Sequence, residues 1–304
     1  MSCWLLQLIN ICIIPLLLMG VIRKTKALLQ TRYGAPVLQP FYDLAKLLRK
    51  SETISGTASW VFIWSPRVGL MIAVLTAVCV PWAGLVLPEG WRGASNFLFV
   101  LYLLALGKFL TMLAAMDTGS AFGGLGASRE ATISLLVEPA LVIGLGAFAL
   151  QTGQMDLTAM YAAPASPIVA ALVGCALIIA ALAELSRMPV DDPTTHLELT
   201  MVHEAMILEN SGRNLALIEY AGALRACLYF GLAAQTLLHV WPGFATLAFG
   251  WHYALSLGAL FLLGIAVAVA EGILVKLKWR AVPNYLAFAT ALSLLAALVA
   301  AAQG

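Results

Sequence analysis

Long apolar segments dominate this chain and restrict what it can fold into. They lie near residues 4–22, 67–87, 96–116, 131–151, 166–186, 217–239, 253–275 and 283–302. A helix needs about 20 apolar residues to cross the hydrocarbon core of a bilayer. Lipid cannot hydrogen-bond an open backbone, so such segments must be helical. Only 11% of the residues are charged, against about 25% in soluble domains. The sequence predicts an all-α integral membrane protein, a bundle of about eight transmembrane helices that forms a single polytopic domain over residues 1–304.

The basic residues predict the orientation of this bundle. With the N-terminus outside, the cytoplasmic segments hold Arg23, Lys24, Lys26, Arg32, Lys46, Arg49, Lys50, Arg129, Arg187, Arg213, Lys276, Lys278 and Arg280, whereas the opposite loops hold only Arg92. Cytoplasmic loops are enriched in Lys and Arg. The pattern predicts a multi-pass protein of the bacterial inner membrane with both termini in the periplasm. Cations follow the first apolar segment rather than precede it, which indicates a retained helix and not a signal peptide.

The three long loops, near residues 23–66, 117–130 and 187–216, all fall on the predicted cytoplasmic side, where a partner would dock. In the first loop, Phe41, Leu44, Leu47 and Leu48 recur at helical spacing, opposite Asp43, Lys46, Arg49 and Lys50. This pattern predicts an amphipathic helix in the membrane interface. Two roles remain open for it: a lipid anchor, or the wall of a cavity at the membrane surface.

Ionisable residues inside the predicted spans are the candidates for function. They are Lys108, Glu138, Glu184, Glu219, Arg225 and Glu271. A charge near the bilayer centre costs about 2.5–3.5 kcal/mol by insertion scales, so each one needs a reason. A set spread over five helices suits a proton channel. The alternative is that Lys108–Glu138 and Glu219–Arg225 are static ion pairs that hold the bundle together.

The remaining polar residues argue against a resident cofactor. The five cysteines are scattered and lack the spacing of a disulfide framework, zinc site or iron–sulfur site. His196 and His203 are expected to be solvated loop residues, and His239 and His252 at the outer edge do not form a facing haem pair. No basic run of the nucleic-acid-binding type occurs. Any redox centre is therefore expected in another chain.

The glycine-rich stretch 117–130 is not a phosphate-binding loop. It lacks the Gly-Lys-Ser/Thr ending and follows a predicted membrane helix rather than a strand. Ser128 is expected to cap the fourth span, with Glu130 in its first turn.

Three loop motifs carry a family resemblance. Residues 38–47 read LQPFYDLAKL, residues 126–130 read GASRE, and residues 183–191 read AELSRMPVD. In this order they resemble the respiratory complex I subunit 1 family, which includes the quinone-chamber subunit of NADH:quinone oxidoreductase. It also includes the matching subunits of membrane-bound nickel–iron (NiFe) hydrogenases such as formate hydrogenlyase and hydrogenase-4. The resemblance implies eight helices, a first loop packed under a catalytic module, and membrane acids that serve as a proton channel.

Carried over by motif position, Glu138 and Glu184 match channel acids of the family, Asp191 matches an acid of the third loop, and Glu209 matches the Glu of a Glu-Tyr-Ser-Gly motif. The docking candidates are charged and polar loop residues: Arg32, Gln39, Asp43, Lys46, Asp117, Arg129, Arg187, Asp191, Asp192, Glu198 and Glu209. Thr194 and His196 stand where the family has acids, and Asn210 replaces the usual tyrosine. The short first loop favours the hydrogenase branch.

The resemblance thus implies a non-redox membrane subunit of a multi-subunit oxidoreductase complex of the NiFe-hydrogenase or formate hydrogenlyase type. It would dock the hydrophilic module and couple electron transfer to proton translocation. The expected partners are the lipid bilayer, a hydrogenase-like large subunit, iron–sulfur subunits and antiporter-like membrane subunits, with the NiFe and iron–sulfur centres in those partners. Three alternatives remain open: a quinone-chamber subunit, a stand-alone ion transporter and a purely structural anchor.

Overall fold

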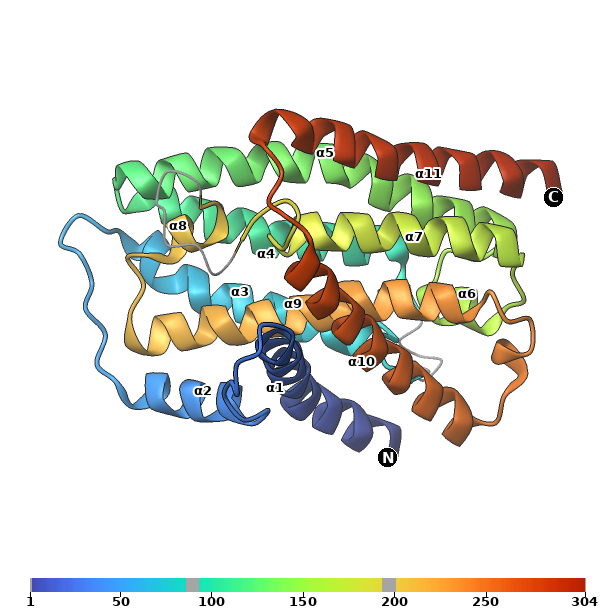
Figure 1. Cartoon of the computed structure of the whole chain (residues 1–304), viewed down its shortest axis with the longest axis horizontal. Coiled ribbons are helices and arrows are strands. Elements are labelled where there is room, and N and C mark those ends of the chain that lie inside the picture. The colour runs from blue at the N-terminus through green and yellow to red at the C-terminus, as the bar shows by residue number, and fades with distance from the viewer. Residues whose placement is uncertain (1, 86–92, 193–200, 304) are drawn as a thin grey trace.

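Eight long helices form the protein (Figure 1), as the computed structural model of residues 2–85, 93–192 and 201–303 shows. Each is long and apolar enough to cross a membrane. They are α1 (Ser2–Leu29), α3 (Trp60–Cys79), α4 (Phe97–Asp117), α5 (Ala121–Thr152), α7 (Pro167–Glu184), α9 (Gly212–Leu238), α10 (Phe249–Ile273) and α11 (Val282–Gln303). Short helices connect them: α2 (Gln39–Arg49), α6 (Leu157–Ala162), α8 (His203–Ile207), η2 (Phe244–Thr246) and η3 (Trp279–Ala281). The prediction of an all-α membrane bundle with eight spans is confirmed.

Helix α9 forms the centre of the bundle and is packed by α1, α2, α3, α7 and α10. Close approach needs a small residue at one point on its surface. A Cβ on Gly231 would lie 2.7 Å from the carbonyl oxygen of Trp82, whose side chain is only 1% exposed. Helices α5, α7 and α11 pack together on one side of α9, and α1 and α10 pack on another.

The second span begins and ends earlier than predicted. It covers Trp60–Cys79 rather than residues 67–87. Ser59 caps its start, and the Asp117 carboxylate accepts hydrogen bonds from Ser59 N, Ser59 Oγ and Phe62 N at 2.8, 2.7 and 3.2 Å. Its end follows from Pro81, because the residue before a proline is disfavoured in helical geometry, and Val80 is extended.

The glycine-rich stretch 117–130 is mostly helix, so its prediction as a cytoplasmic loop is wrong. Helix α5 begins at Ala121 after Ser120, and Ser128 is not its cap. Two glycines allow its first turns to pack tightly: a Cβ on Gly123 would meet Ala115 O at 2.6 Å, and one on Gly126 would meet Val202 O at 2.9 Å. The glycines therefore serve close packing here, which outweighs their low helix propensity.

Helix α2 is amphipathic as predicted and lies beside α1 and α9. Pro40 is buried, and Leu44 and Leu47 are half-buried on the inner side, while Leu48 faces outward and is 45% exposed. Leu48 therefore does not belong to the inner apolar face.

The two ends of the bundle differ in what they carry. Helices α2 and α8 lie at the left in Figure 1, whereas α6 lies at the right, and both chain termini lie in the right-hand half. The long connections thus gather at one end, as the loop lengths predict.

Candidate functional site

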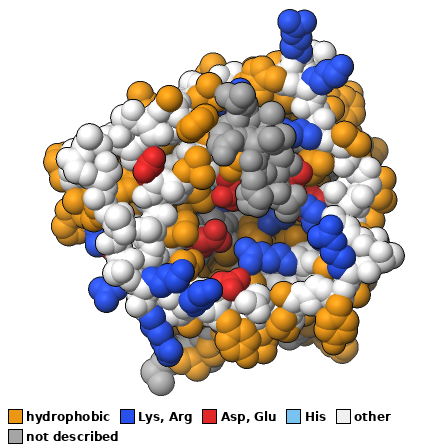
Figure 2. All heavy atoms as spheres, turned by 60° about the vertical axis from the view of Figure 1, so that its left-hand side comes forward, with side chains coloured by type: hydrophobic (Ala, Val, Ile, Leu, Met, Phe, Trp, Pro, Cys, Tyr) orange, Lys and Arg blue, Asp and Glu red, His pale blue; other side chains and the backbone are white. Residues whose placement is uncertain are grey.

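A charged cavity of ≈ 420 Å³ opens among α1, α4, α5, α7, α8, α9 and α10. Figure 2 shows acidic and basic side chains gathered around this hollow, on the side of the molecule that carries α2 and α8. Its lining includes the cations Arg23, Lys26, Lys108, Arg187 and Arg225 and the acids Glu130, Glu184, Glu204, Glu219 and Glu271. Five cations and five acids thus face the same cavity. This balance matters because an uncompensated charge inside a membrane domain is costly.

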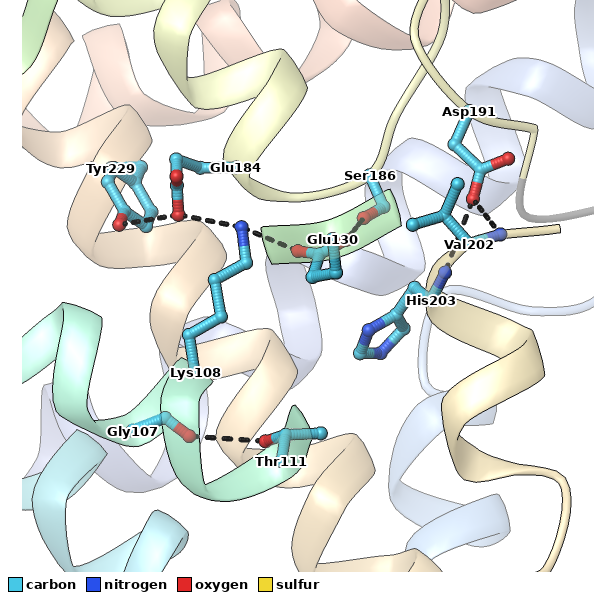
Figure 3. A network of polar contacts seen from close by, with 10 residues as sticks. All are labelled: Gly107, Lys108, Thr111, Glu130, Glu184, Ser186, Asp191, Val202, His203 and Tyr229. Atoms are coloured by element: carbon cyan, nitrogen blue, oxygen red, sulfur yellow. Dashed lines mark hydrogen bonds and ion pairs between the residues drawn. The ribbon is translucent and has the colours of Figure 1, made fainter. Parts of the chain in front are cut away.

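Lys108 joins two acids at the inner end of this cavity (Figure 3). Its Nζ atom lies 2.5 Å from Glu130 Oε1 and 2.9 Å from Glu184 Oε2. Lys108 is 5% exposed and Glu130 only 1%. The hydroxyl of Tyr229 donates to Glu184 at 3.2 Å, and the hydroxyl of Ser186 donates to Glu130 at 3.3 Å. Helices α4, α5, α7 and α9 therefore meet in one hydrogen-bonded network of ionisable groups.

Glu184 reaches this network because α7 ends there. Helix α7 has 18 residues and stops at Glu184, and Ser186 follows with a φ of 49°. Arg187 N bonds back to Leu182 O at 2.8 Å, so the chain turns away from the helix axis. An 18-residue helix spans about 27 Å, slightly less than the hydrocarbon core of about 30 Å. The turn after α7 thus lines the cavity and brings Arg187 into it.

A second ionic group lies towards α10. Glu271 is 6% exposed and pairs with Arg187 at 2.9 Å and with Lys26 at 3.6 Å. The buried Asp191 accepts hydrogen bonds from Lys276 at 2.6 Å and from Val202 N at 3.1 Å. These contacts tie the segment after α7 to α1, to α10 and to the start of α8.

Arg225 differs from the other cations of the cavity. No hydrogen bond or ion pair forms from its guanidinium to any residue in the described part of the chain, although it lines the cavity on α9. His203 lies in the same cavity, and burial together with the charges of Arg225 and Lys108 lowers its pKa to about 3. The cavity therefore contains a neutral imidazole and a guanidinium whose donors remain available to an anionic or carbonyl group.

A second cavity of ≈ 270 Å³ adjoins the first beneath α2. Leu16 of α1, Leu44 and Leu47 of α2 and Tyr220 of α9 supply its apolar lining. The two cavities share Met19, Arg23, Glu219 and Ala223. Helix α2 is therefore the wall of a cavity, one of the two roles that the sequence left open.

Five of the six channel candidates line the charged cavity: Lys108, Glu184, Glu219, Arg225 and Glu271. Glu138 does not, since it is exposed on the outer face of α5 beside Leu135, which is 71% exposed. Neither of the two ion pairs of the static alternative forms. Lys108 pairs with Glu130 and Glu184 rather than Glu138, and Glu219 lies 3.8 Å from Arg23 rather than pairing with Arg225.

Glu130 and Tyr229 are the site residues that sequence reasoning missed. Glu130 was expected in the first turn of a helix, but α5 extends about three turns further toward its N-terminus and carries Glu130 into the core. The spacing to Glu138 could not have identified it, because residues eight apart in a continuous helix lie about 80° apart around its axis, and Glu138 is exposed.

The docking candidates occupy three kinds of position. Asp117, Arg187 and Asp191 hold helix ends and ionic contacts inside the fold. Gln39 donates to Asp43 at 2.9 Å, and Arg129 lies over the Trp279 ring and donates to Met201 O. Asp192 is half-buried, while Arg32, Lys46 and Glu209 are exposed. Glu198, like His196, lies outside the described residues. His203, expected in solvent, lines the cavity instead.

No group of three or more His, Cys, Asp or Glu side chains is arranged to hold a metal ion within residues 2–85, 93–192 and 201–303. His239 contacts the Phe244 ring edge-on, and His252 stacks on the same ring.

Comparisons with known proteins agree with this architecture. Formate hydrogenlyase subunit 4 of Escherichia coli (strain K12) is 33% identical over 230 residues, covering 73% of this chain and 72% of that protein. Hydrogenase-4 component C of the same strain is 30% identical over 225 residues, covering 73% and 70%. A subunit of the NADH-quinone oxidoreductase of Wolbachia pipientis wMel is 27% identical over 263 residues, covering 79% and 73%.

A solved structure has the same fold. A chain of the membrane-bound sulfane sulfur reductase, an archaeal respiratory membrane complex, superimposes with a TM-score of 0.81 at 19% identity and covers 99% of this chain and all of that one. The sequence profile described as NADH dehydrogenase matches residues 3–301. The chain therefore belongs to the NADH dehydrogenase family of membrane subunits, the complex I subunit 1 type.

Proposed function

We propose that this chain is the membrane-anchoring and proton-conducting subunit of a complex I-like oxidoreductase of the NiFe-hydrogenase or formate hydrogenlyase type. The observation that carries the proposal is the buried network of Lys108, Glu130, Glu184 and Tyr229, whose three charged members line a cavity at the end that carries the long loops. The two E. coli relatives bear the names of a formate hydrogenlyase subunit and a hydrogenase component.

Proton movement would pass through groups that already exchange hydrogen bonds. The Lys108 ammonium donates to Glu184, and the Tyr229 hydroxyl donates to the same carboxylate oxygen. A change of charge in a docked redox module, next to residues 185–192 and 201–207, would alter the field at Glu184 and Glu271. In a medium of low dielectric constant such a change acts over several ångströms. Each acid could then release its proton to water in the cavity and recover another.

Docking would use the same end of the bundle. The hydrophilic partners, a hydrogenase-like large subunit and iron–sulfur subunits, would supply the NiFe and iron–sulfur centres and cover the cavity opening. A carbonyl or carboxylate group of such a partner would suit the free donors of Arg225. Glu138 on the outer face of α5, between exposed apolar residues, would contact an antiporter-like membrane subunit. The orientation proposed from the loop cations places the termini on the periplasmic side of the bacterial inner membrane.

Purification of the tagged chain from native membranes in mild detergent, followed by mass spectrometry, tests the docking role. The proposal predicts co-purification of a NiFe-type large subunit with iron–sulfur subunits. It also predicts that Arg225→Ala weakens this association more than Arg67→Ala, since Arg67 is exposed on α3 and does not line the cavity. Recovery of the chain alone in a single monodisperse peak would contradict the proposal and favour a stand-alone transporter.

One observation favours a second candidate, a quinone-chamber subunit. The cavity beneath α2 adjoins the charged cavity, so an apolar molecule could pass from the membrane surface towards Arg225 and Glu184. Enlarging the wall residue Leu47 of α2 to Trp discriminates between the candidates. Electron transfer in the purified complex would fall sharply if a quinone entered by this route, and would stay at the native rate if the chain only docks and conducts protons.

A further inference from the structure

The connection between α10 and α11 carries an exposed basic and aromatic cluster. Helix α10 ends at Ile273, residues 274–278 have no regular secondary structure, and the short helix η3 leads into α11. Lys278, Trp279 and Arg280 follow one another at this point. All three side chains are exposed, Trp279 to 44%. These three residues are called the Lys278–Arg280 cluster below.

The fold holds this connection against the bundle. Leu277 N, directly before the cluster, donates to Pro189 O at 2.8 Å. Arg129 of α5 lies over the Trp279 ring, with its guanidinium carbon 5.8 Å from the ring centroid. The inner side of the connection is therefore occupied by contacts with the protein, and its exposed side chains face outwards.

The cluster has two positive charges that no acid compensates. Glu271 and Asp191, the acids near this connection, are buried and form their ion pairs inside the fold. Within the described part of the chain, no ion pair includes Lys278 or Arg280. The sequence from 272 to 304 also contains no Asp or Glu. The outer surface is therefore basic here and would attract an anion.

The lengths of the two helices place the cluster at the membrane surface. Helix α10 has 25 residues and α11 has 22, so they span about 37 Å and about 33 Å, against about 30 Å for the hydrocarbon core. Ile273 and Val275, just before the cluster, are 74% and 81% exposed. Large apolar side chains therefore adjoin the cations, which suits acyl chains next to a charged headgroup. Tryptophan is enriched at this depth of a membrane.

Helices α10 and α11 diverge from this connection, with α7 between them (Figure 1). Helix α11 packs against α5 and α7, whereas α10 packs against α1 and α9, and α7 packs against α9. On α7, Cys175 is exposed and Ile168 is 58% exposed. A hydrocarbon chain could lie along this surface, with the Lys278–Arg280 cluster at its end. Basic groups between membrane helices on the cytoplasmic side are typical binding sites for lipid headgroups.

We propose that the Lys278–Arg280 cluster binds the phosphate of an anionic phospholipid whose acyl chains lie between α10 and α11. The Arg280 guanidinium and the Lys278 ammonium donate to the phosphate oxygens. This site does not rest on the proposed function. In the orientation that the loop cations predict, the lipid belongs to the cytoplasmic leaflet. The sequence has no Lys or Arg in residues 239–272 and 281–304, so the other ends of these two helices offer no such cations.

Quenching of Trp279 fluorescence tests this selectivity. The full chain would be held in phosphatidylcholine nanodiscs in which a small fraction of the lipid, either phosphatidylglycerol or phosphatidylcholine, carries brominated acyl chains. The difference between native protein and Trp279→Phe isolates the Trp279 emission. A cation at the membrane surface favours an anionic lipid by about fivefold, so two cations give about 25-fold. We therefore expect brominated phosphatidylglycerol to quench Trp279 several times more strongly. Equal quenching by both lipids would overturn the proposal.

Two double variants with the same change of charge identify the cations responsible. Lys278→Gln/Arg280→Gln should remove the preference for phosphatidylglycerol. Arg49→Gln/Arg213→Gln is the matched control, because it removes two exposed cations at the same end of the bundle, and it should keep the preference. A preference that survives the first variant, or that the control removes equally, would also overturn the proposal. If the first variant does not insert, the comparison of the two lipids with native protein still decides.

The same measurement distinguishes a lipid from an acidic protein partner. The chain would be purified in mild detergent with the subunits that accompany it and placed in the same nanodiscs. A bound lipid predicts that brominated phosphatidylglycerol still quenches Trp279 in this assembly. Loss of quenching by both lipids would show that a protein covers the Lys278–Arg280 cluster and would overturn the proposal.

Discussion

Replacing Lys108 with methionine is the sharpest test of the buried ionic network. Lys108 Nζ lies 2.5 Å from Glu130 Oε1 and 2.9 Å from Glu184 Oε2. The two carboxylate oxygens are therefore at most about 5.4 Å apart, and without the ammonium they would repel each other by about 3 kcal/mol at an effective dielectric constant of about 20. Removing one partner of a buried ion pair costs about 3–5 kcal/mol in measured cases, which agrees in magnitude.

A proton limits this cost. In Lys108→Met, one of the two carboxylates can take up a proton instead of repelling the other. Protonating a glutamate of ordinary pKa, about 4.3, at about pH 7 costs near 3.7 kcal/mol, at about 1.36 kcal/mol per pH unit. At about pH 5 the same proton costs about 1 kcal/mol. The destabilisation of Lys108→Met should therefore shrink from about 3 kcal/mol at about pH 7 to about 1 kcal/mol at about pH 5.

The free energy of unfolding, measured by denaturant titration in mixed micelles at both pH values, checks this. The double variant Lys108→Met/Glu130→Gln is the matched control, because it removes the repulsion between the two carboxylates and leaves Glu184 with the hydrogen bond from Tyr229, and the part of the loss that comes from repulsion should return. A Lys108→Met protein as stable as the native one at neutral pH would refute the reasoning, as would a loss that does not depend on pH.

Three further predictions follow from single contacts. Gly231→Ala places a Cβ against the backbone of Trp82 and should destabilise the protein by about 1–3 kcal/mol. Gly222→Ala lies on the same helix with open space around it, so its stability in the same denaturant assay should be unchanged or higher by up to about 1 kcal/mol. Asp117→Ala removes three hydrogen bonds from the start of α3 and should lower stability by about 1–2 kcal/mol, with Asn at this position restoring part of it. The pKa of His203, lowered to about 3, means that the unfolded chain binds a proton below about 6.5 that the folded protein does not, so stability is lost as pH falls. Between about pH 6.5 and pH 4.5 native protein should lose up to about 2 kcal/mol more than His203→Gln, and parallel stability curves for the two would contradict it.

Hydropathy was sufficient to predict the membrane bundle, because apolar length and backbone satisfaction leave few choices in lipid. The amphipathic character of α2 was equally clear from its spacing. The limits of α5 could not be predicted, because Gly123 and Gly126 indicate a loop unless their packing against Ala115 and Val202 is known. That packing depends on tertiary contacts that local propensity does not record.

The candidate site was predicted as a set of residues but not as a set of contacts. Five of the six membrane charges line one cavity, since a charge in a membrane span must face the protein interior or a partner. Which acid meets which base depends on helix rotation and depth, so the sequence could not show that Lys108 pairs with Glu130 and Glu184 rather than with Glu138. Glu138 would also avoid lipid if it faced a second membrane subunit, as proposed above.

Proton movement per electron, measured in inverted membrane vesicles that contain the assembled complex, tests the central proposal most directly. Vesicles would be driven with a reduced viologen dye, with hydrogen formation and internal pH recorded together. The account predicts that Glu184→Gln retains hydrogen formation but loses most of the coupled proton uptake, while Asp156→Asn, altered at the acid that caps α6 at the other end of the bundle, retains both. Native proton uptake per electron in Glu184→Gln would contradict the claim that the buried network conducts protons.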